Sequence, residues 1–239
     1  MDTVGKSSWT GGVLMRFKDV FSIIGPAMTG PSSSHTAGAV RLGRMAHHWV
    51  GSTPERCVMT LYGSFADTYK GHGTDLALLG GLLDYNTDDA RIIDAEEQAA
   101  QAGMAYEFVT SSLPAPHPNT VRIDAWQAGR KSTLVGSSIG GGNIQVQQLN
   151  EFRVNLTGEL PILTLLHSDK PGMLGAITTA LGASGVNIAY MHVDRTGRDG
   201  EALSAIETDS IIPRPLLEYL QSLTYMYEVK VMDIRNTAK

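Results

Sequence analysis

The stretch ILTLLHSDKPGMLGAITTALGASGVNIAYMHVD, residues 162–194, decides the fold of the C-terminal part of the chain. It opens on an apolar run, passes a Pro and a Gly, and then shows apolar residues at helical spacing before a second apolar run. This pattern predicts a strand, a helix and a strand. Downstream, two further β-favouring runs enclose another helical pattern. The predicted elements are strands at 162–167, 186–194, 202–208 and 227–234, with helices at 172–183 and 213–222.

The order βαββαβ of these elements is that of a ferredoxin-like, split-βαβ domain. The preceding part of the chain predicts an α+β domain with a mostly antiparallel sheet. Its helices are expected at 39–50, 74–83 and 88–103, and its strands at 58–62, 106–110, 121–126, 131–138, 143–148 and 152–156. A Gly and a Pro in the segment Thr157–Pro161 mark the boundary. We therefore expect domains at 15–157 and 160–236, after an extension or tag at 1–14.

The composition of the 239-residue chain limits its function classes. Hydrophobic residues make up 42% and charged residues 18%, which is ordinary for a globular protein with a sizeable core. The formal net charge of −5 predicts no attraction to polyanions, so nucleic acid is not an expected partner. No apolar run is long enough to cross a bilayer, and residues 1–12 lack a hydrophobic signal core. We therefore expect a cytoplasmic protein with no membrane partner.

Cys57 is the single cysteine of the chain. One thiol cannot form an internal disulfide, a four-thiolate zinc site or a self-contained iron–sulfur cluster. Because Cys57 precedes an apolar run at 58–61, we expect a buried structural thiol rather than a reactive one.

The segment Ser32-Ser33-Ser34-His35-Thr36 places four hydroxyls and an imidazole immediately before a predicted helix. Free N–H groups and the positive end of the dipole make a helix start favourable for a carboxylate or a phosphate. The segment lacks the lysine and the glycine spacing of a nucleotide P-loop, which favours a small carboxylate. A serine-rich cap and surface turn explains the same composition equally well.

Two further loops carry histidine. His72 lies between two glycines at another predicted helix start, where a capping or packing role is the simpler interpretation. His117-Pro118-Asn119 fixes an imidazole and a carboxamide on a stiff, proline-rich segment. Histidine is the usual acid/base group near neutral pH, so three such loops in one domain indicate a reactive site. Gly140–Gly142 suits close backbone approach or a hairpin turn, and His47–His48 is expected to be a solvated helix face.

In the C-terminal domain, the loop His167–Gly172 joins the first strand to the first helix, and Asn187 opens the next strand. Such a loop can hold an amino acid through its backbone and polar side chains. A structural turn explains Pro171-Gly172 equally well. The residues leave both possibilities open.

Four motifs follow one another along the chain: Ile24–Pro26 with the serine-rich loop, Tyr62–Asp75, His117–Thr120 and Ser138–Gly142. Together they resemble the beta subunit of the bacterial two-chain, iron–sulfur-dependent L-serine dehydratases. Residues 160–234 resemble an ACT domain, similar to the regulatory domain of phosphoglycerate dehydrogenase. The N-terminal domain resembles the allosteric substrate-binding domain of that enzyme.

The resemblance implies a lyase subunit that converts L-serine to pyruvate and ammonia with a cysteine-bearing alpha subunit. In that family, a [4Fe–4S] cluster ligated by the alpha subunit acts as a Lewis acid on the serine hydroxyl, so this chain would hold no metal and would be inactive alone. The implied catalytic residues are His35 and His117, and the implied substrate-binding residues are Ser33, Ser34, Thr36, Asn119 and His72.

The ACT likeness implies effector contacts at His167, Asp169 and Asn187, and homodimer contacts through either domain. Asp169 departs from the related dehydrogenase loop, which carries Asn there. A carboxylate at this position would repel the carboxylate of a bound amino acid and favour its ammonium group. The alternative function is that of a non-catalytic, amino-acid-sensing regulatory protein that binds L-serine.

Overall fold

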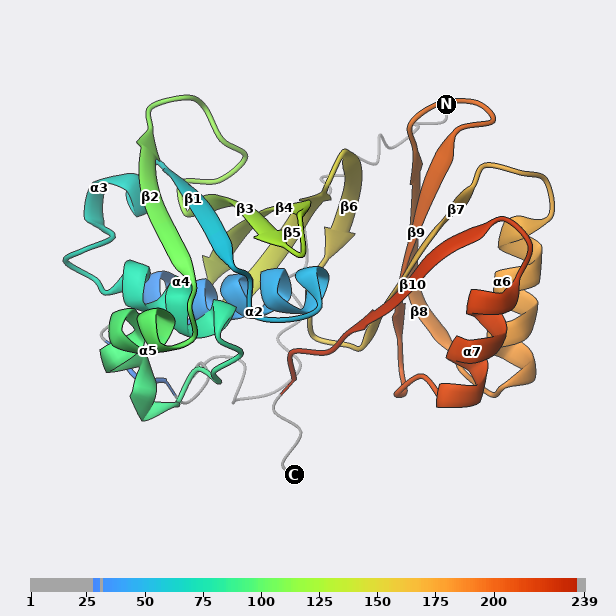
Figure 1. Cartoon of the computed structure of the whole chain (residues 1–239), viewed down its shortest axis with the longest axis horizontal. Coiled ribbons are helices and arrows are strands. Elements are labelled where there is room, and N and C mark those ends of the chain that lie inside the picture. Colours follow the sequence, from blue (N-terminus) through green and yellow to red (C-terminus); the bar gives the residue numbers. More distant parts are fainter. Residues whose placement is uncertain (1–27, 31, 236–239) are drawn as a thin grey trace, which may run out of the picture.

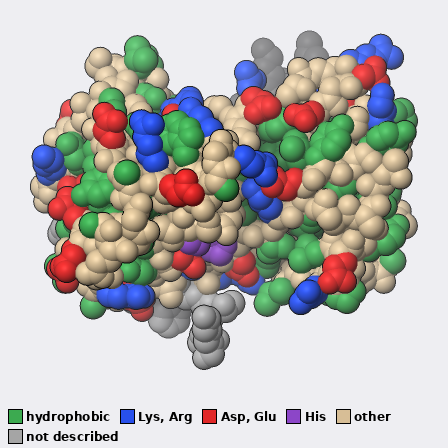
Figure 2. All heavy atoms as spheres, viewed as in Figure 1, with side chains coloured by type: hydrophobic (Ala, Val, Ile, Leu, Met, Phe, Trp, Pro, Cys, Tyr) green, Lys and Arg blue, Asp and Glu red, His purple; other side chains and the backbone are tan. Residues whose placement is uncertain are grey.

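The computed structural model describes residues 28–30 and 32–235. The predicted extension at 1–14, the Ile24–Pro26 motif and Pro31 lie outside these residues. The described chain forms two sheets that stand side by side, each with helices on one face (Figure 1). On the face drawn in Figure 2, acidic and basic side chains are interspersed over both halves of the molecule. None of the described helices is long and apolar enough to span a bilayer.

The N-terminal sheet has six strands in the order β2-β1-β3-β4-β5-β6. β1 and β2 pair in parallel and the other neighbours pair antiparallel, so the predicted α+β class and sheet type are confirmed. Helices α2, α4 and α5 lie along one face of this sheet (Figure 1). The bounds are β1 (Arg56–Tyr62), β2 (Ala105–Ser111), β3 (Thr120–Gln127), β4 (Arg130–Gly140), β5 (Asn143–Leu149), β6 (Phe152–Leu156), α2 (Gly38–Val50), α4 (Thr74–Leu82) and α5 (Ala95–Gln101).

Three local predictions differ from the structure. A π-helical turn, η1 (Ser33–Ala37), precedes α2, so helical backbone begins earlier than the apolar spacing indicates. The third helix was expected as one piece, but it begins as a 3₁₀ turn, η2 (Ala90–Asp94), where the Asp89 carboxylate accepts from Arg91 N at 2.9 Å. The short helix α3 (Ser64–Thr68) was not predicted, because five residues carry too little periodicity to be recognised.

Helices α2 and α4 cross at close range because glycines face the crossing from both helices. A Cβ atom added to Gly43 would lie 2.5 Å from Leu78 O and 2.9 Å from the Cα of Gly81. Side chains at a helix contact set the distance between the axes, so glycines allow the closest approach. The crossing brings the start of α2 to the start of α4, where Thr36 Oγ1 donates to His72 O at 3.3 Å.

The C-terminal sheet has four antiparallel strands in the order β10-β7-β9-β8. Helices α6 and α7 cover one face of this sheet (Figure 1). The order of the elements confirms the predicted ferredoxin-like βαββαβ fold of the C-terminal domain. The bounds are β7 (Ile162–Ser168), α6 (Met173–Ala183), β8 (Ile188–Arg195), β9 (Glu201–Thr208), α7 (Arg214–Ser222) and β10 (Met226–Met232).

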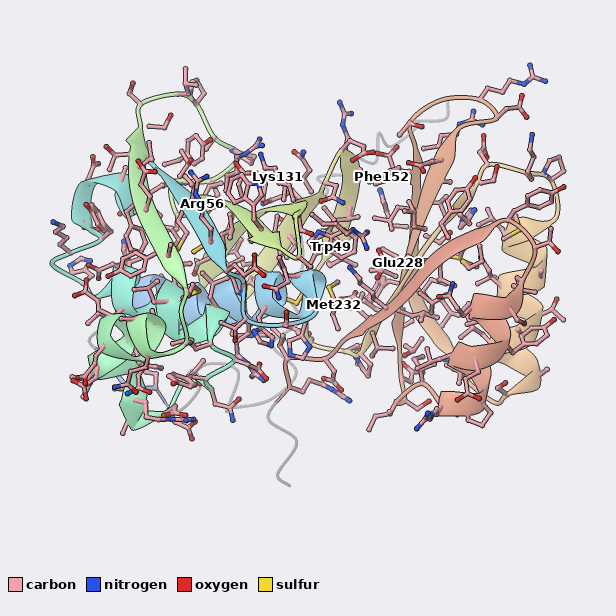
Figure 3. All side chains as sticks on the ribbon, in the orientation of Figure 1. Trp49, Arg56, Lys131, Phe152, Glu228 and Met232 are labelled. Atoms are coloured by element: carbon pink, nitrogen blue, oxygen red, sulfur yellow. The ribbon has the colours of Figure 1, made fainter. Side chains whose placement is uncertain are left out.

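The other face of the C-terminal sheet packs against the N-terminal domain. Trp49, Phe152 and Met232 lie between the two sheets (Figure 3). Beside them, the buried Glu207 carboxylate accepts from both N and Oγ1 of Thr157 at 3.0 Å. A single hydrophobic cluster therefore joins the two domains, and its members from the C-terminal domain are Ile162, Leu203, Ala205, Met232 and Ile234.

Candidate active site

The serine-rich loop folds into the start of α2 through a side-chain cap. Ser32 has extended backbone, and its Oγ accepts from His35 N at 3.2 Å while its carbonyl accepts from Thr36 N at 2.8 Å. The hydroxyls of Ser33 and Ser34 are half-buried and have no hydrogen-bond partner within the described ranges 28–30 and 32–235. Ser32 therefore caps the helix, and the hydroxyls of Ser33 and Ser34 remain available to a ligand. Turns of π-helix are frequent at functional sites.

The His35 ring is held from several sides. Its Nε2 lies 3.0 Å from Ser64 Oγ, and its Nδ1 lies 3.4 Å from Ser32 Oγ. The ring of Phe65 meets it edge to face at 5.5 Å between centroids, and the ring of His72 does so at 4.8 Å. Both nitrogens therefore have a hydroxyl neighbour from this chain, and the surrounding rings fix the orientation of the imidazole.

His72 is exposed and approaches His35 from the segment before α4. Burial first, and then the charge of His72, lowers the pKa of His35 below the usual value for histidine. The lowered pKa favours the neutral imidazole of His35, which is the form that can accept a proton.

The loop of His117 reaches the same region through the backbone. Asn119 N donates to His117 Nδ1 at 3.1 Å, so the neutral form of this ring carries its proton on Nε2. The loop joins the His35 side of the site at Pro118, whose carbonyl accepts from Phe65 N at 3.4 Å. His117 lines a cavity of about 320 Å³, and no hydrogen bond or ring contact in the described part of the chain joins it to His35.

Two of the elements that pack against η1, α4 and β4, carry buried polar atoms without a partner. Within the described residues, Thr74 Oγ1, Asn119 Oδ1 and Ser138 Oγ have no hydrogen-bond partner, and neither has Gln147 Oε1 on β5. Thr74 and Ser138 are 0% exposed. An unpaired polar group away from water costs about 1–3 kcal/mol, so these atoms call for ordered water or for the polar groups of a ligand.

Ser138 lies against the first residue of α2. A Cβ atom on Gly38 would lie 2.7 Å from the Cβ of Ser138 and closer still to its Oγ. Thr74, Ser138 and Ser64 were not among the predicted site residues. All three stand inside the recognised motifs, which was the signal available in the sequence, but small hydroxyl residues in glycine-rich turns are common without a functional role.

The described residues do not fit an iron–sulfur cluster. β1 places Cys57 in the core at 0% exposure, and burial raises the pKa of its thiol to about 12. No group of three or more His, Cys, Asp or Glu side chains in the described part of the chain could hold a metal ion. The prediction of a buried structural thiol is confirmed, and a cluster would need thiolates from another chain.

The histidine pair on α2 is structural. His47 Nδ1 lies 2.9 Å from Leu82 O, and His48 Nε2 lies 3.3 Å from Asp84 Oδ1. Both residues are half-buried. The expectation of a solvated face was therefore wrong, because the two rings fasten α2 to the end of α4.

The loop His167–Gly172 between β7 and α6, called the ACT loop below after the resemblance noted in the sequence, borders a separate cavity of about 380 Å³, lined by His167 and Asp169. His167 is buried, with Nδ1 at 2.9 Å from Ser168 O and Nε2 at 2.9 Å from Ser204 Oγ, so the protein occupies both ring nitrogens. The Asp169 carboxylate accepts from Arg195 Nη1 at 2.8 Å.

Asn187 lies away from this cavity. It precedes β8 at the end where Ile188 pairs with Thr208, whereas Arg195 at the opposite end pairs with Ala202 beside the ACT loop. Its Nδ2 donates to Asp209 Oδ2 at 2.6 Å. Within one chain, the three predicted effector residues therefore do not form a single site.

Comparison with known proteins assigns the chain to a family. Residues 17–108 match the family model for the serine dehydratase beta chain, and residues 162–224 match that for the ACT domain. The chain is 43% identical over 220 residues to the probable L-serine dehydratase beta chain of Bacillus subtilis, a match that covers 92% of this chain and 100% of that relative. The chain belongs to the L-serine dehydratase beta-chain family.

A second beta chain agrees with this assignment, and part of a dehydrogenase is also similar to this chain. The L-serine dehydratase beta chain of Peptoniphilus asaccharolyticus is 37% identical over 204 residues, covering 84% of this chain and 90% of that relative. The D-3-phosphoglycerate dehydrogenase of Synechocystis is 26% identical over 180 residues, which cover 75% of this chain but 32% of that enzyme. The matched region 17–108 contains His35 and His72, and His117 lies beyond it.

Proposed function

We propose that this beta chain is one subunit of an L-serine ammonia-lyase, which converts L-serine to pyruvate and ammonia together with a cysteine-bearing alpha subunit. The arrangement around His35 carries the proposal, because its imidazole lies between two serine hydroxyls. The turn that contains His35 packs against α4 and β4, which hold the unpartnered oxygens of Thr74 and Ser138. Such a compact polar site suits a small amino acid. The identity to two L-serine dehydratase beta chains supports the same substrate class.

The residues of this chain bind and orient the substrate. The hydroxyls of Ser33 and Ser34 receive the carboxylate at the start of α2, where the helix dipole favours an anion. Asn119 Oδ1, which lacks a partner among the described residues, accepts from the ammonium group. Thr36 holds His72 in place through the carbonyl of that residue. An imidazole, that of His35 or of His117 on the neighbouring loop, takes the proton from the substrate Cα.

The [4Fe–4S] cluster belongs to the alpha subunit in this proposal, because the single thiol of this chain is buried in β1. When bound there, the cluster would supply a Lewis acid that weakens the bond between the substrate Cβ and its hydroxyl oxygen. The beta chain alone is therefore inactive. Its contribution is the binding of serine and the handling of protons.

The test is anaerobic co-expression with a cysteine-bearing alpha chain, followed by measurement of pyruvate release from L-serine. We expect turnover from the pair and none from either chain alone. His35→Ala should abolish turnover while leaving the subunits associated, and His192→Ala, which removes an exposed histidine of β8, should leave turnover unchanged. Full activity of the alpha chain by itself would contradict the proposal, and an unchanged rate in His35→Ala would remove His35 from the site.

The cavity beside the ACT loop supports a second candidate function, that of an amino-acid sensor that binds L-serine. Calorimetry of the isolated chain with L-serine separates the two functions. Binding that is lost in Asp169→Ala and retained in His35→Ala favours sensing through the ACT loop. Binding that is lost only in His35→Ala favours the N-terminal site.

A further inference from the structure

Ser64 lies where separate parts of the candidate site meet. Its Oγ is 3.0 Å from His35 Nε2, and the next residue, Phe65, donates its N–H to Pro118 O at 3.4 Å. The turn that places Ser64 requires glycine, because Gly63 has a φ of 52° and a Cβ atom there would lie 2.7 Å from Pro118 O. The backbone therefore fixes the Ser64 hydroxyl between the His35 turn and the proline-rich loop.

Ser64 contacts Nε2 of the His35 ring, whereas Ser32 contacts Nδ1. Ser32 Oγ accepts from His35 N at 3.2 Å and lies 3.4 Å from Nδ1, whereas the contact of Ser64 with Nε2 is shorter, at 3.0 Å. A neutral imidazole has one donor nitrogen and one acceptor nitrogen, so the partners at both nitrogens together decide which of them carries the proton. The shorter contact has the greater influence on that choice.

We propose that Ser64 is a positioning residue of the lyase: it holds the His35 ring and fixes its proton, and so sets how readily His35 exchanges a proton with the substrate. This inference rests on the proposed function, because Ser64 acts through His35. Among the described residues, the titratable group that faces the ring is His72, from the segment before α4. The other neighbours, Phe65 on α3 and Ser32 at the cap of η1, are not ionisable.

The first measurement follows the C2–H resonance of His35 by NMR in the full chain as pH is varied, with His35→Gln for assignment. Ser64→Ala should move the pKa of His35 by about half a unit or more, the change expected on loss of one hydrogen bond to the ring. A downward shift identifies Ser64 as the acceptor of an Nε2 proton, and an upward shift identifies it as a donor to Nε2. Ser64→Thr retains the hydroxyl and should keep the wild-type titration.

The second measurement uses the complex with the alpha chain. In Ser64→Ala, kcat for L-serine should fall about tenfold or more with little change in KM, because misplacement of an acid/base group removes part of its typical contribution of about 100-fold or more. The acid limb of the pH profile of kcat/KM should move by the shift seen in the NMR titration. Ser64→Thr should restore kcat. Ser222→Ala is the matched control, because it removes a serine hydroxyl that bonds a helix carbonyl in the ACT domain.

An unmoved titration of His35 in Ser64→Ala overturns the inference, and so does a loss of kcat that Ser64→Thr fails to restore. Both results leave the proposed function standing. A His35→Ala complex that works at the wild-type rate overturns the inference and the function of His35 together. Circular dichroism confirms folding, and if Ser64→Ala does not fold, Ser64→Cys provides the same comparison with a weaker donor.

Discussion

Replacing Gly81 with Ala tests whether the close crossing of α2 and α4 supports the candidate site. The new Cβ atom would lie 2.8 Å from both Arg44 N and the Cα of Gly43, and closer still to Val40 O. These are backbone atoms, so no side-chain rotation relieves the contact. The helices must separate by more than 0.6 Å before the ordinary contact distance of 3.4 Å is restored.

The expected loss of stability follows from two opposing effects. A clash with backbone lies at the upper end of overpacking costs, about 3 kcal/mol, and the helix preference for Ala over Gly returns about 1 kcal/mol. We therefore expect the free energy of unfolding to fall by about 2 kcal/mol in Gly81→Ala. For a chain of this size, that loss lowers Tm by about 4–8 °C.

Gly182→Ala is the matched control in α6. No heavy atom lies within 4 Å of a Cβ atom at this position, and Gly182 has no positive φ. Only the helix preference then acts, and Tm should rise by about 2–4 °C. Thermal unfolding followed by circular dichroism measures both variants, and pyruvate release by the complex should fall in Gly81→Ala. A Tm of Gly81→Ala equal to or above that of the wild type would refute the inferred crossing.

Two further predictions concern titratable groups. Cys57 should not react with a thiol reagent at pH 8 in the native chain and should react after denaturation, because burial raises the pKa of its thiol to about 12. Rapid labelling of the native chain would contradict the placement of Cys57 in β1. For Asp84, burial alone would raise the pKa of the carboxyl, but hydrogen bonds from His48 and Arg44 hold the pKa below its usual range. Asp84→Asn should therefore lose roughly 1 kcal/mol of stability at pH 7, after allowance for solvent screening, and the difference from the wild type should shrink as pH falls below about 4. Urea unfolding at the two pH values checks this, and a difference that grows with acid would contradict it.

The C-terminal domain could be predicted from sequence almost element by element because each element carries a strong local signal. The helix at α6 has apolar residues at helical spacing and a Pro and a Gly directly before it, and the predicted range 172–183 differs from the observed Met173–Ala183 by one residue. The N-terminal strands were found for the same reason. The helix α3 was missed because its start depends on the positive φ of Gly63, which no periodicity reports.

The candidate site could be predicted only in part. His35 and His72 were chosen from separate loops, and their ring contact depends on the crossing of α2 and α4, which is a tertiary feature. The glycines that allow it, Gly43 and Gly81, look in the sequence like ordinary weak points of a helix. The hydrogen bond between His35 and Ser64 joins residues that are 29 positions apart and depends on the turn after β1. The local sequence pattern around either residue could not reveal it.

Helix α2 gives the site a physical dependence on both domains. Six residues after His35, Arg41 donates from Nη1 to Gly142 O at 3.0 Å and from Nη2 to Gly158 O at 3.2 Å. One guanidinium thus holds both the glycine turn that follows Ser138 and the segment that leads into β7. Because the fork of Arg has a fixed geometry, the two carbonyls are tied to each other and, through the Arg41 side chain, to α2. The position of the His35 ring therefore depends on α2, and through Arg41 on the segment that joins the two domains. The serine-rich loop by itself does not determine the geometry of the site.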